Sequence, residues 1–224
     1  MSASVRQAVY RCYARRLRSR LRGLPLPRHV AIIMDGNRRW ARRQGLDDLS
    51  AGHRHGAEQL GQVLGWCEEL GIGQVTVFVV SIDNLRKRDA GEVDFLMRLA
   101  EQKSGEVLAG PANRWQIRIA GQIDLLPDST ALALKEVEEA TRDLGSGLCL
   151  TLAIGYDGRA EVMDALRSLL LEAADAGRTT AELAGSLTDA DIAAHLYTHG
   201  LPDPDLVIRT SGEQRLGGFL RRAV

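Results

Sequence analysis

The chain has 224 residues, 45% of them hydrophobic, which is enough to bury the core of one α/β domain of ordinary size. Its formal net charge is zero, and it contains neither an apolar run long enough to cross a bilayer nor the short apolar block of a secretory signal, so we expect a cytoplasmic protein. Cys12, Cys67 and Cys149 are far apart and lack CxxC spacing, which excludes a disulfide framework or zinc site and predicts reduced thiols, the last two in the core.

Charge is segregated at the start of the chain, because residues 1–24 contain seven arginines and no acidic residue. Apolar residues recur there at every fourth position: Val5, Val9, Tyr13, Leu17 and Leu21. The pattern predicts a basic amphipathic helix that ends at the proline linker of residues 24–27. We favour a surface helix docked on the domain; contact with anionic lipid headgroups is the second alternative and nucleic acid the third.

From residue 29 onward, short β-branched runs alternate with longer segments of helical period. This alternation predicts an α/β fold with an open, largely parallel sheet flanked by helices. The predicted strands span 29–34, 74–80, 115–120, 148–154 and 205–209. The predicted helices span about 52–70, 90–108, 128–143, 158–176 and 188–196, with loops at 124–129 and 145–147. Residues 1–27 would therefore precede a single domain at 28–224.

Polar, glycine-rich and basic segments follow the strands, at the edge where open parallel sheets bind ligands. They are residues 35–40, 81–84, 121–122, 155–159 and 210–215. Close backbone amides, hydroxyls and planar guanidinium groups are what a diphosphate requires. Gly36 to Arg39 lie at a strand-to-helix turn, and Arg209, Ser211 and Arg215 can approach from the last strand, so this edge is a candidate diphosphate site.

Each of these residues also has a structural interpretation. Asp35 at such a turn is commonly a helix N-cap, although among so many phosphate-binding groups a bridging magnesium ion is favoured. The arginines have an equal alternative as solvated or salt-bridged residues. Trp40 more often packs in a core, and His53 and His55 are more often structural than catalytic. No strand is followed by GxGxxG or GxxxxGK[ST], which argues against a nucleotide site.

The string from His29 to Ala41, HVAIIMDGNRRWA, resembles the opening motif of the undecaprenyl diphosphate synthase, or cis-prenyltransferase, family. The resemblance continues through residues 52–56, 81–85, 155–159 and 205–216, in family order over about residues 28–220. It implies an enzyme that condenses isopentenyl diphosphate with an allylic diphosphate, releases diphosphate and forms a cis double bond. It also implies Mg²⁺ as the metal and a homodimer as the assembly.

The resemblance assigns roles to individual residues. Asp35 would bind magnesium and be required for turnover, and Asn84 takes the place of the asparagine assigned to proton removal. Because an amide is a poor base, we expect Asn84 to orient the substrate while a diphosphate oxygen accepts the proton. Residues at diphosphate-holding or substrate-contacting positions are Gly36, Asn37, Arg38, Arg39, Trp40, His53, Ser81, Ile82, Asp83, Leu85, Arg88, Arg209, Arg215, Leu216 and Gly217.

Several features refine or depart from the family pattern. Residues 10–13 and 45–48, together with Leu85, are similar to the short-chain actinobacterial branch, which favours (2Z,6E)-farnesyl diphosphate made from geranyl diphosphate. Ile82 replaces a small hydroxyl residue, Asp83 shortens a glutamate, and residues 86–88 are one residue longer than usual. Gly217 stands where long-chain relatives often have serine. Asp157 replaces a glycine and would add negative charge near the phosphate site.

The C-terminal end is a larger departure, because the family continues beyond Leu220 with a further helix, a magnesium-binding glutamate, a strand and a last helix. We therefore expect a truncated catalytic domain with weak or no activity. A non-catalytic subunit that partners an active enzyme is the alternative function, but retention of residues 35–40 together with 209–215 favours an enzyme. A membrane or nucleic-acid module would leave the strand-end residues without a purpose, so no nucleic-acid partner is expected.

Overall fold

The computed structural model describes residues 3–48, 50–109, 113–215 and 218–219. In this part of the chain, five parallel strands form one sheet in the order β3-β4-β2-β1-β5. The strands are β1 (His29–Ile33), β2 (Gln74–Ser81), β3 (Gln116–Ala120), β4 (Cys149–Tyr156) and β5 (Leu206–Arg209). The predicted open parallel sheet is confirmed, and every predicted strand lies within two residues of an observed one.

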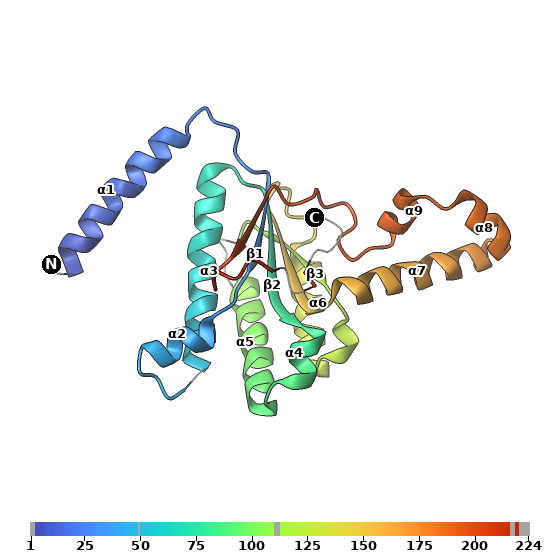
Figure 1. Cartoon of the computed structure of the whole chain (residues 1–224), viewed down its shortest axis with the longest axis horizontal. Coiled ribbons are helices and arrows are strands. Elements are labelled where there is room, and N and C mark those ends of the chain that lie inside the picture. The colour runs from blue at the N-terminus through green and yellow to red at the C-terminus, as the bar shows by residue number, and fades with distance from the viewer. Residues whose placement is uncertain (1–2, 49, 110–112, 216–217, 220–224) are drawn as a thin grey trace.

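Some helices pack against this sheet, and others, such as α1 and α8, extend away from it (Figure 1). The helices are α1 (Ala3–Leu21), α2 (Asn37–Arg43), α3 (Ser50–Leu70), α4 (Ile82–Lys87), α5 (Ala90–Ala109), α6 (Asp128–Thr141), α7 (Gly158–Asp175), α8 (Thr180–Ser186) and α9 (Asp189–Ala194), with a 3₁₀ turn η1 (Ile123–Leu125). The sequence did not predict α2, α4 or α8 as helices, because six or seven residues repeat an apolar period too few times. The predicted 124–129 loop overlaps the end of η1 and the start of α6.

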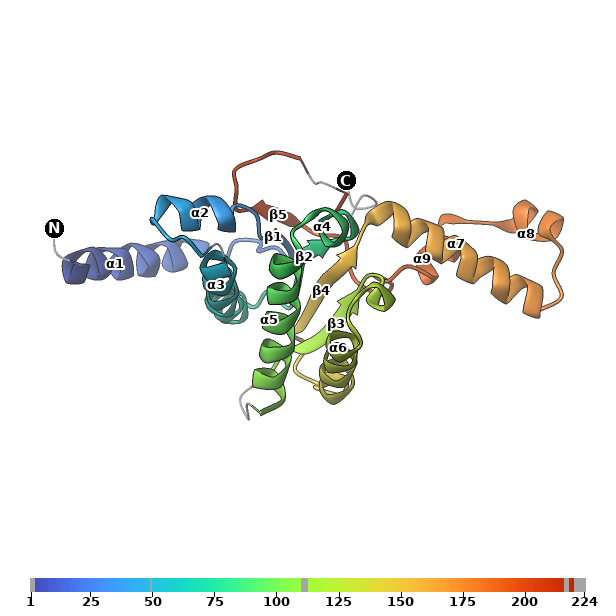
Figure 2. The ribbon, with the colours of Figure 1, turned by 90° about the horizontal axis from the view of Figure 1, so that it is seen from below.

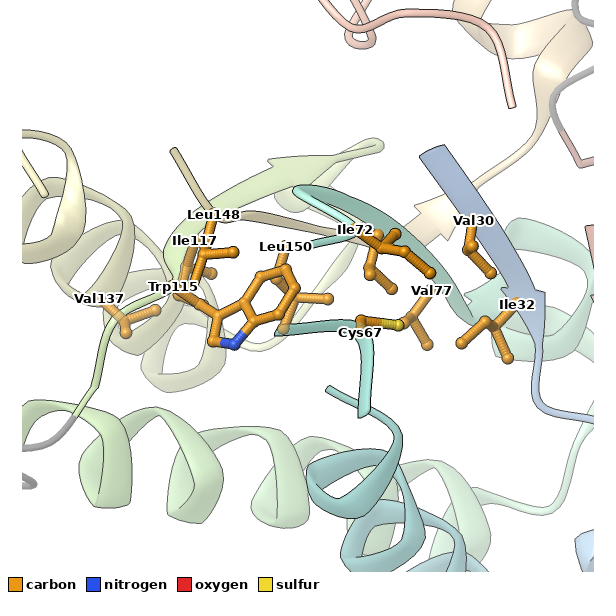
Figure 3. Packing of buried hydrophobic residues seen from close by; sticks show 11 residues of the cluster. Val30, Ile32, Cys67, Ile72, Val77, Trp115, Ile117, Val137, Leu148 and Leu150 are labelled. Atoms are coloured by element: carbon orange, nitrogen blue, oxygen red, sulfur yellow. The ribbon is translucent and has the colours of Figure 1, made fainter. Parts of the chain in front are cut away.

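One face of the sheet is apolar and is covered by α3, α5 and α6 (Figures 1 and 2). In Figure 3, Cys67 of α3 lies next to Val77 of β2, with Val30 and Ile32 of β1 beyond it, and Val137 of α6 lies at the other end on the side of Trp115 and Ile117. Strands buried in this way consist of nearly continuous runs of β-branched residues, and their bounds were therefore predicted accurately from the sequence. Cys67 and Cys149 are both buried, as predicted.

The other face carries smaller residues and an aromatic cluster of Phe78, Tyr156 and Phe219. The segment that connects α9 to β5 packs here through His29, whose Nδ1 lies 2.6 Å from the Pro202 carbonyl oxygen and whose Nε2 lies 2.8 Å from Thr76 Oγ1. A carbonyl only accepts, so Nδ1 carries the proton. Burial lowers the pKa of His29, with the Pro202 contact opposing it, and the neutral ring fixes the entry to β5.

Helix α1 projects from the domain (Figure 1). Val9 and Tyr13 of its apolar stripe are 58% and 59% exposed, so the expectation of a docked surface helix is wrong. Its one ion pair to another helix among the described residues joins Arg18 to Glu69 of α3 at 2.5 Å, and both side chains are about half exposed. Packing against the domain would stabilise an arginine-rich helix only slightly, because its charged guanidinium groups remain hydrated at the surface. None of the described helices is long and apolar enough to span a bilayer.

Candidate active site

The ends of β1 and β5 are fastened together by Thr210. Ile33 pairs with Arg209 in the sheet, and one residue further Thr210 Oγ1 accepts a hydrogen bond from the Asp35 amide at 3.0 Å. The same hydroxyl donates to the Asp35 carbonyl oxygen at 2.6 Å. This clip fixes the backbone of Asp35 beside Arg209. Thr210 was not among the residues predicted from the sequence, although it lies inside the motif at 205–216.

Asp35 and Arg209 form the central pair of the site. Arg209 NH2 and Nε lie 2.6 Å and 3.2 Å from Asp35 Oδ2. Partial burial raises the pKa of Asp35, but hydrogen bonds from Arg209 and Ser211 and the charge of Arg209 outweigh it, so the pKa is below its usual value. Asp35 is therefore an anion at neutral pH, as a metal ligand must be.

Glu213 supplies a second carboxylate. Its Oε2 lies 3.1 Å from Arg209 NH2, the nitrogen that also binds Asp35, and 2.8 Å from Arg215 Nε. Its Oε1 lies 3.6 Å from Arg39 NH2. Three of the predicted phosphate-binding arginines thus converge on one glutamate. Sequence reasoning missed this role, although Glu213 lies between Arg209 and Arg215 in the same motif.

The turn after β1 depends on Gly36 and on the close approach of α3. Gly36 has φ of 96°, a conformation that other residues rarely adopt, and it caps α2 without a side-chain hydrogen bond. A Cβ on Gly52 would lie 2.3 Å from the Asn37 carbonyl oxygen, so only glycine lets α3 pack here. Arg38 and Arg39 leave α2 toward different carboxylates, Arg38 toward Glu92 and Arg39 toward Glu213.

Glu92, near the start of α5, gathers the second group of predicted residues. Its Oε1 accepts hydrogen bonds from Arg88 NH1 at 2.8 Å and from His53 Nε2 at 3.0 Å, and its Oε2 lies 3.5 Å from Arg38 NH1. Burial lowers the pKa of His53, which the hydrogen bond to Glu92 opposes. Glu92 was not among the predicted residues, although its four-residue spacing from Arg88 is that of a helical ion pair.

An apolar cavity of about 470 Å³ begins beside this second group and runs between α3 and α5 over the apolar face of the sheet. At the carboxyl end of the strands it is lined by Asn37, His53 and Arg88. Its walls are mainly aliphatic, and they include Met34, Leu60, Leu64, Leu96, Leu99, Ala100, Val107, Ile117, Val137 and Leu150. A basic and polar mouth on an apolar cavity suits an amphiphile with an anionic head.

The remaining predicted residues are arranged around these two groups. Ser81 caps α4 by accepting from the Asn84 amide at 2.9 Å, which places Asn84 in the first turn of that helix. Ile82 is buried, and Leu85 packs against the cluster that includes Leu96 and Leu134.

Two of the predicted residues, Asp83 and Trp40, contact side chains outside the two arginine groups. Asp83 is exposed and pairs with Lys87 at 2.7 Å, so it does not join the arginine network. Trp40 is 37% exposed and stacks on His55 with 4.4 Å between ring centroids, so it is not a core residue. Leu216 and Gly217 lie outside the described residues.

The residues at this edge suit magnesium. Within the described ranges, no three His, Cys, Asp or Glu side chains form a closed metal cage. Magnesium, however, is commonly held by one or two carboxylates together with substrate phosphates. Asp35 offers one such carboxylate, and Glu213 shares its arginine partner.

Comparison with known proteins identifies the family. Residues 33–222 match the family model described as "Putative undecaprenyl diphosphate synthase". The chain belongs to this family. It is 58% identical over 212 residues to an isoprenyl transferase of Streptomyces fradiae, covering 94% of this chain and 82% of the relative. It is 49% identical over 216 residues to the (2Z,6E)-farnesyl diphosphate synthase of Thermobifida fusca, covering 96% and 83% of the two chains.

The fold agrees with this assignment. The crystal structure of lavandulyl diphosphate synthase from Lavandula x intermedia, in complex with dimethylallyl diphosphate, superposes with a TM-score of 0.76 at 31% identity. The match covers 86% of this chain and 81% of that one. The chain is therefore a cis-prenyltransferase, an enzyme of prenyl-chain elongation, and the comparisons give no support to a non-catalytic partner subunit.

Proposed function

We propose that the chain joins an allylic diphosphate to isopentenyl diphosphate, with geranyl diphosphate as primer and (2Z,6E)-farnesyl diphosphate as product. One observation supports this most directly: a cluster of guanidinium groups lies beside the polar mouth of an apolar cavity of about 470 Å³. The cluster matches diphosphate oxygens, and the cavity matches a hydrocarbon tail. The relatives named as farnesyl diphosphate synthases support the product.

The residues divide between two diphosphates. Arg38 and Arg39, with the amides after Gly36, hold the allylic diphosphate, and Arg209 and Arg215 hold isopentenyl diphosphate. Asp35 would hold the metal, and bound Mg²⁺ would supply Lewis-acid stabilisation of the negative charge on the departing diphosphate. The allylic carbon–oxygen bond breaks, and a carbon–carbon bond forms to the terminal alkene carbon of isopentenyl diphosphate. Asn84 orients that unit, while a diphosphate oxygen takes the proton it loses.

Arg88 gives independent support for an anion at the mouth of the cavity. Its guanidinium lines the cavity and is held by Glu92 through NH1, while its Nε is buried without a hydrogen-bond acceptor among the described residues. A buried donor left without a partner costs stability unless a ligand supplies the acceptor. An oxygen of the allylic diphosphate fits this requirement.

The test is a primer panel. The protein is incubated with labelled isopentenyl diphosphate, Mg²⁺ and dimethylallyl, geranyl or farnesyl diphosphate, and the products are separated by chain length. We expect the highest kcat/KM with geranyl diphosphate, a fifteen-carbon product, and none with a chelator present. Preference for another primer would correct the product. A protein that neither condenses any primer nor binds a diphosphate in the presence of Mg²⁺ would refute the proposed reaction.

Two features of assembly complete the proposal. The exposed basic helix α1 suits an anionic membrane surface, where arginines meet headgroups and Val9 and Tyr13 reach the acyl boundary. Sedimentation with vesicles that contain an anionic phospholipid, compared with neutral vesicles, tests this contact; equal binding to both would refute it. Homodimer formation, which the family resemblance implies, is tested by sedimentation equilibrium.

A further inference from the structure

Glu92 joins three segments that meet at the mouth of the cavity. Arg38 comes from α2, His53 from α3 and Arg88 from the end of α4, and each places a nitrogen within 3.5 Å of the Glu92 carboxylate. The two short contacts share Oε1, and the longer one uses Oε2. One carboxylate therefore sets the relative orientations of three basic side chains that come from three different helical segments.

This cluster is more buried than the network around Asp35. The side chain of Glu92 is 15% exposed, that of Arg88 18% and that of His53 8%. Burial strengthens hydrogen bonds to charged groups, and it penalises any charge that loses its partner. A carboxylate only accepts hydrogen bonds, so His53 must present Nε2–H to it, and the neutral ring keeps its lone pair on Nδ1. Glu92 thus selects the tautomer of His53 as well as its direction.

Glu92 itself is not among the residues that line the cavity, whereas His53 and Arg88 are. In the cavity wall, the side chains nearest to a ligand at this end are therefore those that Glu92 holds, and not Glu92 itself. By engaging NH1 of Arg88, it holds the guanidinium in the orientation in which the buried Nε has no acceptor among the described residues.

We propose that Glu92 is a positioning residue, which aims Arg88, His53 and Arg38 at the diphosphate of the allylic substrate. This role rests on the proposed function. It also predicts whether diphosphate binding becomes weaker or tighter when Glu92 is replaced, because Glu92 is an anion near a site for an anion. Its charge alone would repel diphosphate, so removing that charge would tighten binding if repulsion were its only effect. If Glu92 positions the cations, removing it weakens binding instead.

Calorimetric titration with inorganic pyrophosphate in the presence of Mg²⁺ separates the two outcomes. We expect Glu92→Ala to bind about tenfold more weakly than the wild type, the value of one lost hydrogen bond to a charged group. Glu92→Gln keeps the shape and should bind at least about threefold more weakly. Glu101→Gln is the matched control, because Glu101 is a hydrogen-bonded carboxylate of the same helix that contacts Ser129 and Thr130 instead.

Nitrogen-15 NMR of His53 supplies a readout that a purely structural role would not change. The wild type should show the Nε2–H tautomer, and Glu92→Ala should lose it. Glu92→Gln decides the question if Glu92→Ala does not fold. Unchanged or tighter pyrophosphate binding by a folded Glu92→Gln would overturn the positioning role alone. A wild type that binds no pyrophosphate would overturn the proposed function and this role together.

Discussion

Arg209 binds Asp35 through two nitrogens, with NH2 at 2.6 Å and Nε at 3.2 Å from the same carboxylate oxygen. The carboxylate proposed to hold the metal is thus already engaged by the arginine proposed to hold a substrate. If Asp35 holds magnesium and Arg209 holds a diphosphate, as proposed, binding of these ligands would separate the pair. The pair lowers the pKa of Asp35 and orients both side chains.

Replacing Asp35 by asparagine should remove most of the activity and leave the fold intact. Asparagine keeps the shape but carries no charge for the metal. We expect product formation to fall by more than about 100-fold, beyond the 10–100-fold effect typical of residues outside the first coordination shell. Product formation from labelled isopentenyl diphosphate measures the effect. Asp94→Asn, at an exposed aspartate paired with Arg98, is the control, and equal losses in both variants would contradict a metal-binding role.

The Asp35–Arg209 pair should make stability depend on pH. The pKa of Asp35 is lower in the folded chain than in an unfolded one, so the unfolded state binds the proton more tightly. The contribution is therefore complete above the unfolded pKa of about 3.9 and is lost as pH falls through the folded pKa. Chemical denaturation of the wild type and Asp35→Asn at pH 7 and pH 3 tests this. The difference in unfolding free energy should shrink at pH 3, and a constant difference would contradict it.

Filling the cavity from α5 should shorten the accepted primer. Ala100 lines the cavity, so Ala100→Phe inserts a ring where the prenyl tail is proposed to lie. We expect kcat/KM for geranyl diphosphate to fall about tenfold or more relative to dimethylallyl diphosphate, since overpacking costs about 1–3 kcal/mol. Gln102→Phe, on the exposed side of the same helix, should leave this ratio unchanged. Equal ratios in the two variants would place the tail elsewhere.

Asp157 should act on stability more than on phosphate binding. The structure gives it a local role, since its carboxylate caps α7 by accepting from the amides of Arg159 at 2.9 Å and Ala160 at 3.3 Å. Asp157→Ala should cost about 1 kcal/mol of unfolding free energy, and Asp157→Ser, which can still cap, should restore most of it. Denaturant titration measures both. If Asp157→Ser bound pyrophosphate markedly more tightly, the charge of Asp157 would matter at the site after all.

The sequence predicted those parts of the molecule whose signals are local. Buried parallel strands give uninterrupted β-branched runs, and the long helices repeat their apolar period several times, so both were found. The docked position expected for α1 was wrong, because an apolar stripe such as that of Val9 and Tyr13 does not reveal from sequence whether another surface packs against it. The exposure of Trp40 was missed for a related reason: stacking on His55 requires the packing of α2 on α3, which no local pattern encodes.

The candidate site was predicted in the same uneven way. The arginines could be predicted from the ends of the strands, because parallel topology brings those ends together. The two glutamates that bind these arginines were not predicted. Glu213 belongs to a recognised motif, and its contacts with Arg209 and Arg215 are local in sequence. Its contact with Arg39 arises only when β1 and β5 lie side by side. Glu92 contacts His53 across 39 positions of sequence, a distance over which residue spacing carries no information.

The two walls of the cavity come from different kinds of element. One is the parallel sheet whose strand ends carry Asp35 and Arg209, and the other is the pair of helices α3 and α5. Substitutions on the inward side of those helices can remodel the space for the tail without moving the reacting ends. Descendants of one ancestral enzyme could thus diversify in the size of the isoprenoid they release while inheriting the same bond-forming apparatus.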